Sequence, residues 1–185
     1  EVTRSMKLYI IRHAKVLMKW SRMSDSCVFD EECDEYDNSP IDTSKIIPAD
    51  ISVKRVYCSE SRRSRETARF LMPDRSYSIS DKINEVPLKS FAGVKFKLPL
   101  FVWNILGRVQ WFFNISRQKE SRKQTINRAN LFGEQLISEN ENALIVTHGF
   151  FMRTLVACLK KQGFHVLKSK NAITFANLQR IEMEK

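Results

Sequence analysis

The sequence predicts an α/β domain in which a mainly parallel sheet lies between two layers of helices. Two observations favour this class: short apolar runs typical of buried strands, and helical patterns that alternate with them. A length of 185 residues fits one domain, or two at most. We therefore treat residues 1–185 as one domain; Met6 is a candidate natural start, in which case Glu1–Ser5 would be foreign residues.

Three segments are predicted strands. Leu8–Ile11 (LYII) and Ala143–Val146 (ALIV) are continuous apolar runs, and each ends in a polar turn that contains a histidine. Such unbroken runs are typical of strands buried on both faces of a parallel sheet. Val53–Cys58 is a third candidate, and the tail Ala172–Met183 mixes Ile, Thr and Phe in a strand-like order.

Three segments are predicted helices. Ser61–Met72 has apolar residues on one side and is ended by Pro73. Glu120–Ser138 carries one apolar stripe, and so does Phe150–Lys161, which has Gly163 just past its end.

The charge of the chain is high and unevenly spread. There are 31 Lys and Arg against 21 Asp and Glu, a net charge of +10. Seven of the acids lie in Asp25–Asp37, which has no Lys or Arg and which we interpret as a solvated loop over a pocket rim. The rest of the chain, with 31 basic and 14 acidic residues, attracts anions: phosphorylated small molecules, nucleic acid or acidic lipid.

Several classes of protein are disfavoured. The four cysteines form no C-x-x-C pair for zinc or redox chemistry, and together with the lack of a signal-peptide pattern they suit a cytoplasmic protein. Leu98–Ile115 is the longest apolar-rich stretch, but polar residues interrupt it, so we expect no membrane span. We predict that its aromatic residues build a core or lid helix, with a membrane-surface or dimer face as the minority interpretation. These aromatic residues are Trp103, Trp111, Phe112 and Phe113.

Polar residues follow the predicted strands where a ligand site is expected. In doubly wound sheets, ligands bind outside the carboxyl ends of the strands. Arg12 and His13 follow the first strand, Ser59–Arg63 follows the second, and His148 follows the third. Two histidines beside arginines at one edge indicate a shared anion site, with the rings within about 10 Å of each other.

These residue types suit phosphoryl transfer, which needs a nucleophile, cations for the phosphoryl oxygens and a proton donor for the leaving group. His13 could attack through one ring nitrogen if a backbone carbonyl holds the other. Arg12 and Arg63 could bind phosphate bidentately. His148, when protonated, would add a third positive group.

The motifs resemble a known family in order and spacing. LYIIRHAK is similar to the R-H-G motif that opens the histidine phosphatase superfamily, the branched group of phosphatases and phosphoglycerate mutases. YCSESRRSRETA resembles its second block and matches the phosphate-binding arginine to Arg63. INEVPL resembles the segment with the acid, Glu85, and LIVTHGFFMRTL the block with the second histidine, His148. ESRKQTINR is similar to the helical segment between them, matching Glu120, Ser121 and Arg128.

The resemblance implies a three-layer, phosphoglycerate mutase-like fold and a metal-independent phosphatase that uses no cofactor and acts through a phosphohistidine on a small phosphorylated metabolite. It assigns catalytic roles to His13, Glu85 and His148, and phosphate binding to Arg12 and Arg63. The chain departs from the family where Ala14-Lys15 replaces Gly-Glu, where Lys19 replaces an Asn, and in the segment after Glu85.

Other functions remain as alternatives. Ala14-Lys15 is similar to short bacterial members that act on phosphoproteins, including phosphohistidine, and phosphoglycerate mutase-type transfer is a further enzymatic alternative. The basic charge alone would suit a nucleic-acid or lipid-binding module on an inactive scaffold, but no aromatic-basic RNA motif is present, so we expect no nucleic-acid partner. A homodimer is left open.

Overall fold

The computed structural model of the chain describes residues 5–170 and 177–185. Within these ranges, a six-stranded sheet runs in the order β4-β3-β6-β1-β8-β7. The strands are β1 (Lys7–Arg12), β3 (Arg55–Cys58), β4 (Ser78–Ile79), β6 (Ala143–Thr147), β7 (His165–Lys170) and β8 (Arg180–Glu184). Neighbours from β4 to β1 pair in parallel, whereas β8 pairs antiparallel with both β1 and β7. The predicted mainly parallel sheet is confirmed.

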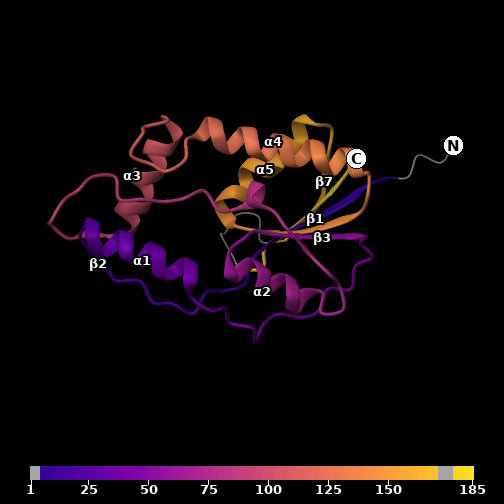
Figure 1. Cartoon of the computed structure of the whole chain (residues 1–185), viewed down its shortest axis with the longest axis horizontal. Helices are drawn as coiled ribbons and strands as arrows, with labels where there is room; N and C mark the ends of the chain where they lie inside the picture. The colour runs from indigo at the N-terminus through magenta and orange to yellow at the C-terminus, as the bar shows by residue number, and fades with distance from the viewer. Residues whose placement is uncertain (1–4, 171–176) are drawn as a thin grey trace.

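The centre of the sheet is buried on both faces, which gives three layers (Figure 1). All five residues of β6 are buried, and successive side chains point to opposite faces. Ala143 and Ile145 pack under α4 (Arg122–Glu139) and α5 (Gly149–Lys161). Leu144 and Val146 join the core beside α2 (Arg62–Leu71).

The three predicted helices form, each within two residues of the expected ends. Ser61 caps α2 because its hydroxyl accepts from the N–H of Ser64. Ser121 caps α4 in a capping box with Gln124. Helix α5 starts directly after β6, with His148 as its N-cap residue. The starts of α2 and α5 therefore lie beside the polar residues at the strand ends.

A smaller group of elements covers the carboxyl edge of the sheet, at the end of the molecule away from the C-terminus (Figure 1). It contains α1 (Ser26–Asn38), α3 (Leu100–Phe112) and a two-stranded ribbon of β2 (Met23–Ser24) with β5 (Leu98–Pro99). The ring of Phe29 in α1 stacks on Trp103 in α3, with centroids 5.3 Å apart, and both side chains are fully buried.

Helix α1 corrects the interpretation of the acidic stretch as a loop. Asp25 caps the helix by accepting from the N–H groups of Cys27 and Val28, and Phe29 anchors it to the core. The acids of this stretch still reach the pocket, since Asp34 and Asp37 line it.

Two further predictions are met in part. Trp103 and Trp111 of α3 are buried as core residues, but Phe112 and the adjacent Phe113 are exposed. The strand-like tail is confirmed where β8 lies, while residues 172–176 lie outside the described part of the chain. Among the described helices, none is long and apolar enough to cross a bilayer.

Candidate active site

The two predicted histidines lie side by side at the carboxyl edge of the sheet. In the parallel register of β1 and β6, Arg12 lies opposite Thr147, so the residues that follow them leave the sheet together. The ring centroids of His13 and His148 are 5.1 Å apart, and both side chains are almost fully buried. The predicted closeness of the rings is confirmed.

The ring of His13 is oriented by its neighbour in the chain. Its Nδ1 lies 2.7 Å from the carbonyl oxygen of Ala14. Because a carbonyl oxygen only accepts hydrogen bonds, Nδ1 carries the ring proton and Nε2 keeps its lone pair. The N–H of Ala14 in turn donates to the hydroxyl of Thr67, which holds the turn against α2. This is the tautomer that a nucleophilic histidine needs.

His148 has the opposite tautomer. The Nε–H of Arg63 donates to its Nδ1 over 3.3 Å, so the proton is on Nε2, which lies 2.7 Å from the hydroxyl of Ser59. Burial, and then the charge of Arg63, lower the pKa of His148 well below its usual range. Near neutral pH the ring is uncharged, so the positive charge at this site comes from the arginines.

The two predicted phosphate-binding arginines lie beside the histidines. Arg63, in the first turn of α2, is almost fully buried and donates to the exposed carboxylate of Asp37 over 2.7 Å. Its guanidinium also lies 4.9 Å from the ring centroid of Tyr36. Arg12 packs against the start of α5, where a Cβ on Gly149 would lie 3.0 Å from its Nε. Only glycine allows this close approach without displacing the arginine.

Glu85 reaches the same site from the chain that follows the 3-10 helix η1 (Asp81–Ile83). Its Oε1 accepts from the N–H of Phe151 over 2.9 Å, and its Oε2 accepts from that of Phe150 over 3.3 Å. These N–H groups belong to the first turn of α5, where they have no partner within the helix. The carboxyl group is thereby tied to the helix that begins beside both histidines.

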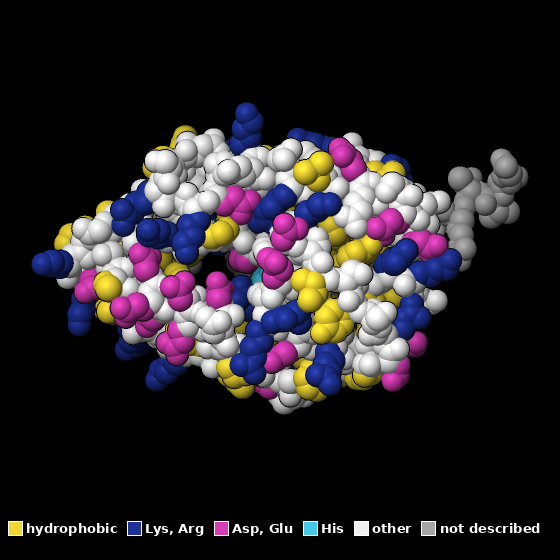
Figure 2. Space-filling view, viewed as in Figure 1, with side chains coloured by type: hydrophobic (Ala, Val, Ile, Leu, Met, Phe, Trp, Pro, Cys, Tyr) yellow, Lys and Arg dark blue, Asp and Glu magenta, His cyan; other side chains and the backbone are white. Residues whose placement is uncertain are grey.

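A cavity of about 660 Å³ opens at this point. Arg12, His13, Arg63 and Glu85 line it, and His148 lies behind them, bonded to Arg63. Figure 2 shows the hollow, with a small histidine surface at its edge and both acidic and cationic side chains around it. The lining also includes the acids Asp34, Asp37 and Glu60, the cations Arg62, Arg65, Arg108 and Lys119, and the apolar residues Trp20, Tyr36, Leu88 and Leu100.

The site has the chemistry of an anion pocket. Its arginines are cationic donors that suit a phosphoryl group, and the N-terminus of α5 adds a favourable dipole. Among the residues that the structure describes, no group of three or more His, Cys, Asp and Glu side chains is arranged to hold a metal ion.

A scan against protein families matches residues 48–185 to the histidine phosphatase superfamily, branch 1. The chain belongs to this superfamily. The matched range contains Arg63, Glu85 and His148, while Arg12 and His13 precede it and are brought to them by the pairing of β1 with β6. Members of this superfamily are phosphatases and phosphomutases. A search of curated protein sequences found no match.

Solved structures with the same fold include three relatives of low identity. A phosphoglycerate mutase from Bacillus anthracis is 16% identical with a TM-score of 0.62, over 98% of this chain and 88% of that one. A mycobacterial glucosyl-3-phosphoglycerate phosphatase is 16% identical with a TM-score of 0.59, over 98% and 91%. The alpha-ribazole phosphatase from Shigella flexneri is 22% identical with a TM-score of 0.54, over 82% and 78%. Together they confirm the phosphoglycerate mutase-like fold.

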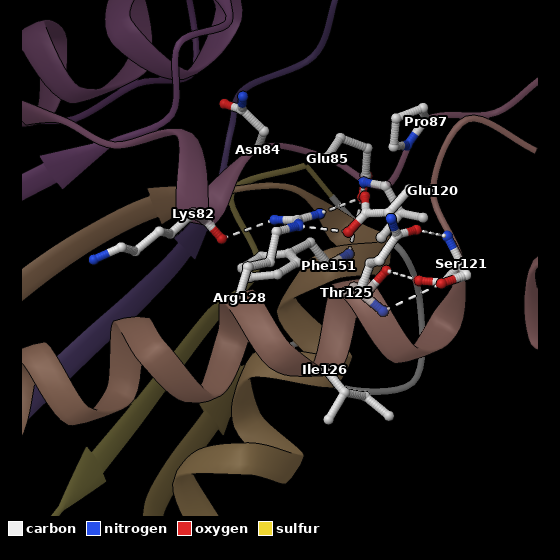
Figure 3. A network of polar contacts seen from close by, with 12 residues as sticks. Lys82, Asn84, Glu85, Pro87, Glu120, Ser121, Thr125, Ile126, Arg128 and Phe151 are labelled. Atoms are coloured by element: carbon white, nitrogen blue, oxygen red, sulfur yellow. Dashed lines mark hydrogen bonds and ion pairs between the residues drawn. The ribbon is translucent and has the colours of Figure 1, made fainter.

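A network behind Glu85 joins the helical motif predicted from the sequence to the site (Figure 3). Arg128 in α4 makes a bidentate ion pair with Glu120, at 2.7 and 3.1 Å. Arg128 also donates to the carbonyl of Lys82 over 2.8 Å, and its guanidinium lies 4.2 Å from the ring centroid of Phe151. The network therefore ties α4 to η1, just ahead of Glu85, and to the first turn of α5.

Sequence reasoning missed several partners of the predicted residues. Ser59 bonds to His148, and Asp37 bonds to Arg63. Of these two partners, only Ser59 lies at a predicted strand end. No sequence motif indicated Arg108, which lies in α3 and donates to the carbonyl of Val86, next to Glu85. Burial lowers the pKa of Arg108, and the nearby charge of Glu85 opposes that shift.

Proposed function

We propose that the chain hydrolyses small phosphomonoesters through a phosphohistidine formed on His13. The observation that carries the proposal is the buried ring of His13, whose Nε2 keeps its lone pair in a pocket with Arg12 and Arg63. A nucleophile, cations for the phosphoryl oxygens and a carboxyl group thus meet in one cavity, as phosphoryl transfer to a side chain requires.

The first half reaction forms the phosphoenzyme. Nε2 of His13 attacks phosphorus in line, and the bond between phosphorus and the ester oxygen breaks. Protonated Glu85 gives its proton to the departing alkoxide, through Oε2, whose backbone contact is the longer one. Arg12 and Arg63 bind the equatorial oxygens, and the Nε2–H of His148 becomes a further donor when it turns from the Ser59 hydroxyl to the phosphoryl group.

The second half reaction returns the enzyme to its starting state. The Glu85 carboxylate takes a proton from water, the oxygen of that water bonds to phosphorus, and the bond between phosphorus and His13 breaks. Inorganic phosphate leaves, and Glu85 is again protonated. No step requires a metal ion, so we propose a metal-independent mechanism.

The cavity supports a small substrate over a phosphoprotein. A volume of about 660 Å³ is within the range of small-molecule sites. Structural relatives include phosphatases that act on small phosphorylated molecules. The same fold also serves a phosphoglycerate mutase, which keeps phosphotransfer between small molecules as the second candidate. We favour the phosphatase because a mutase must retain its substrate between half reactions, whereas a phosphatase needs only water to complete the second one.

The four cysteines carry no disulfide, which supports a cytoplasmic location.

A panel of phosphomonoesters and phosphopeptides, including phosphohistidine peptides, tests the proposal through release of inorganic phosphate. The wild-type chain should hydrolyse at least one small ester, and His13→Ala should lose nearly all turnover. His165→Ala is the matched control, because His165 is exposed on β7. Phosphate release by His13→Ala at the wild-type rate, or hydrolysis of phosphopeptides alone, would reject this function.

A further inference from the structure

Helix α3 is apolar on two faces, and only one of them packs against the rest of the protein. Trp103, Gly107 and Trp111, spaced four residues apart, are buried against the rest of the protein. The other face is exposed: Phe101 and Phe113 are 64% and 67% accessible. The exposed apolar side chains are Phe101, Ile105, Leu106, Val109, Phe112, Phe113 and Ile115, which we call the α3 outer face.

This pattern is not that of an ordinary surface helix, whose outward face is polar. The residues at positions 101, 105, 109 and 112 follow the spacing of one helical stripe, and all are apolar. Figure 1 shows α3 near the end of the molecule away from the C-terminus. Contiguous exposed apolar surface of this kind marks an interaction site.

Cationic side chains flank the α3 outer face in the sequence on both sides. Lys95 and Lys97 precede the helix, with exposed Phe96 between them, and Arg122 and Lys123 follow it; all four cations are exposed. The guanidinium of Arg122 lies 4.4 Å from the ring centroid of Phe112, so cation and apolar surface meet directly.

Negative charge is almost absent from this part of the chain. Between positions 95 and 123 the sequence has seven Lys and Arg and a single acid, Glu120. That acid is bound to Arg128 by a bidentate ion pair. The stretch of chain that carries the α3 outer face is therefore apolar along the helix and positive at both ends.

We infer that the α3 outer face docks the protein onto an anionic lipid surface. An aromatic and aliphatic stripe can enter the boundary between headgroups and acyl chains, while the flanking lysines and arginines bind lipid phosphates and carboxylates. A protein bound in this way lies on the bilayer, and none of the described helices is long and apolar enough to cross it.

A second copy of the chain fits this face less well. In a two-fold dimer the same patch meets itself, so the flanking cations of one copy would face the flanking cations of the other. Like charges at the rim of an interface oppose association, whereas anionic headgroups neutralise them.

Docking by this face also orients the active site. Leu100, Asn104 and Arg108 line the cavity from the neighbouring side of the same helix. A lipid surface under the α3 outer face would thus lie close to the mouth of the pocket.

Vesicle flotation with the full chain tests the inference. Vesicles of phosphatidylcholine alone are compared with vesicles of equal parts phosphatidylcholine and phosphatidylserine. We expect binding to the phosphatidylserine vesicles that weakens as salt is raised, and little binding to phosphatidylcholine. The variant Phe101→Ser/Phe113→Ser should bind about tenfold or more weakly, given the apolar area of each ring. Lys95→Gln/Lys97→Gln should weaken binding to phosphatidylserine vesicles severalfold.

Matched variants separate this surface from general effects. Phe70→Ser removes a ring that is also exposed, on α2, and Lys160→Gln/Lys161→Gln removes two cations at the end of α5; both should bind vesicles as the wild type does. Thermal unfolding checks that every variant is folded. Equal binding by Phe101→Ser/Phe113→Ser and wild type would overturn the inference, as would no vesicle binding at all. A dimer in light scattering that this variant converts to monomer would assign the face to self-association instead.

Discussion

Replacement of Glu85 by glutamine separates its role as an acid from its role in holding α5. The amide oxygen can still accept from the N–H of Phe151, but the amide nitrogen cannot accept from that of Phe150. One lost backbone hydrogen bond costs about 1 kcal/mol, or about fivefold in rate if it acts on the transition state. This structural loss is the same for every substrate.

Loss of the proton donor, in contrast, depends on the leaving group. An alkyl alkoxide leaves poorly without a proton, so kcat/KM for an alkyl phosphate should fall by about 10²–10⁴-fold, which is the usual range for general acid catalysis. A nitrophenolate leaves unaided, so kcat/KM for nitrophenyl phosphate should show little more than the structural loss. Because kcat/KM reports the steps up to the first irreversible one, it does not include the later step in which Glu85 activates water. The comparison between the two substrates therefore reports only on the proton donor.

The assay compares the two substrates for wild type, Glu85→Gln and the control Glu60→Gln. Glu60 also lines the pocket and accepts from the side chain of Asn84 over 2.6 Å, so its variant should reduce both substrates equally and modestly. Equal losses on the two substrates in Glu85→Gln would refute the acid role of Glu85. The proton donor would then have to be sought at Asp34 or Asp37, the other carboxylates of the lining.

Three further predictions concern metal, charge and pH. Turnover should survive EDTA; loss that a divalent ion restores would contradict the metal-independent mechanism. Asp37→Asn removes the exposed partner of Arg63 and should tighten inhibition by inorganic phosphate by about two- to fivefold; an unchanged inhibition constant would mean that the pair does not compete with phosphate. Burial, followed by the charge of Arg63, holds the pKa values of folded His13 and His148 well below the usual 6.5, so the unfolded chain binds more protons and the free energy of unfolding should fall as pH drops below 6.5. Thermal unfolding of His13→Asn/His148→Asn should depend less on pH than that of the wild type. An equal pH dependence in the two proteins would contradict the assignment of this effect to the buried histidines.

The strands that carry the site were predictable from local sequence. Both β1 and β6 lie in the centre of the sheet, so each contains an unbroken apolar run, Leu8–Ile11 and Ala143–Val146, and the polar residues that follow each run stand out. The edge strand β7 was not predicted, because most of its residues are exposed and its sequence therefore lacks an apolar pattern.

Helix α1 was mispredicted for a related reason. Only Phe29 and Glu32 are buried along its length, so no apolar stripe distinguishes it from a solvated loop. Its anchor is the stack of Phe29 on Trp103, a contact between segments far apart in the chain that no local pattern reveals. The Asp25 cap was the one local sign of a helix start.

The predicted members of the site could be found because each lies in a motif at a strand or helix end. Their partners could not. The bond of Asp37 to Arg63 and the position of Arg108 beside Glu85 depend on how α1 and α3 pack over the sheet edge. Helix α3 lies in the segment after Glu85, where the chain departs from the family pattern.

The measurement that tests the central claim most directly is the site of phosphorylation during turnover. Glu85→Gln lacks the group that activates water, so the phosphoenzyme should accumulate when this variant is mixed rapidly with nitrophenyl phosphate. Quenching in base preserves phosphohistidine, and mass spectrometry of the peptides then locates the phosphate. We predict phosphate on His13, up to one per chain, and none in His13→Ala/Glu85→Gln. Phosphate on His148, or continued turnover in Glu85→Gln with no phosphorylated histidine, would contradict the mechanism.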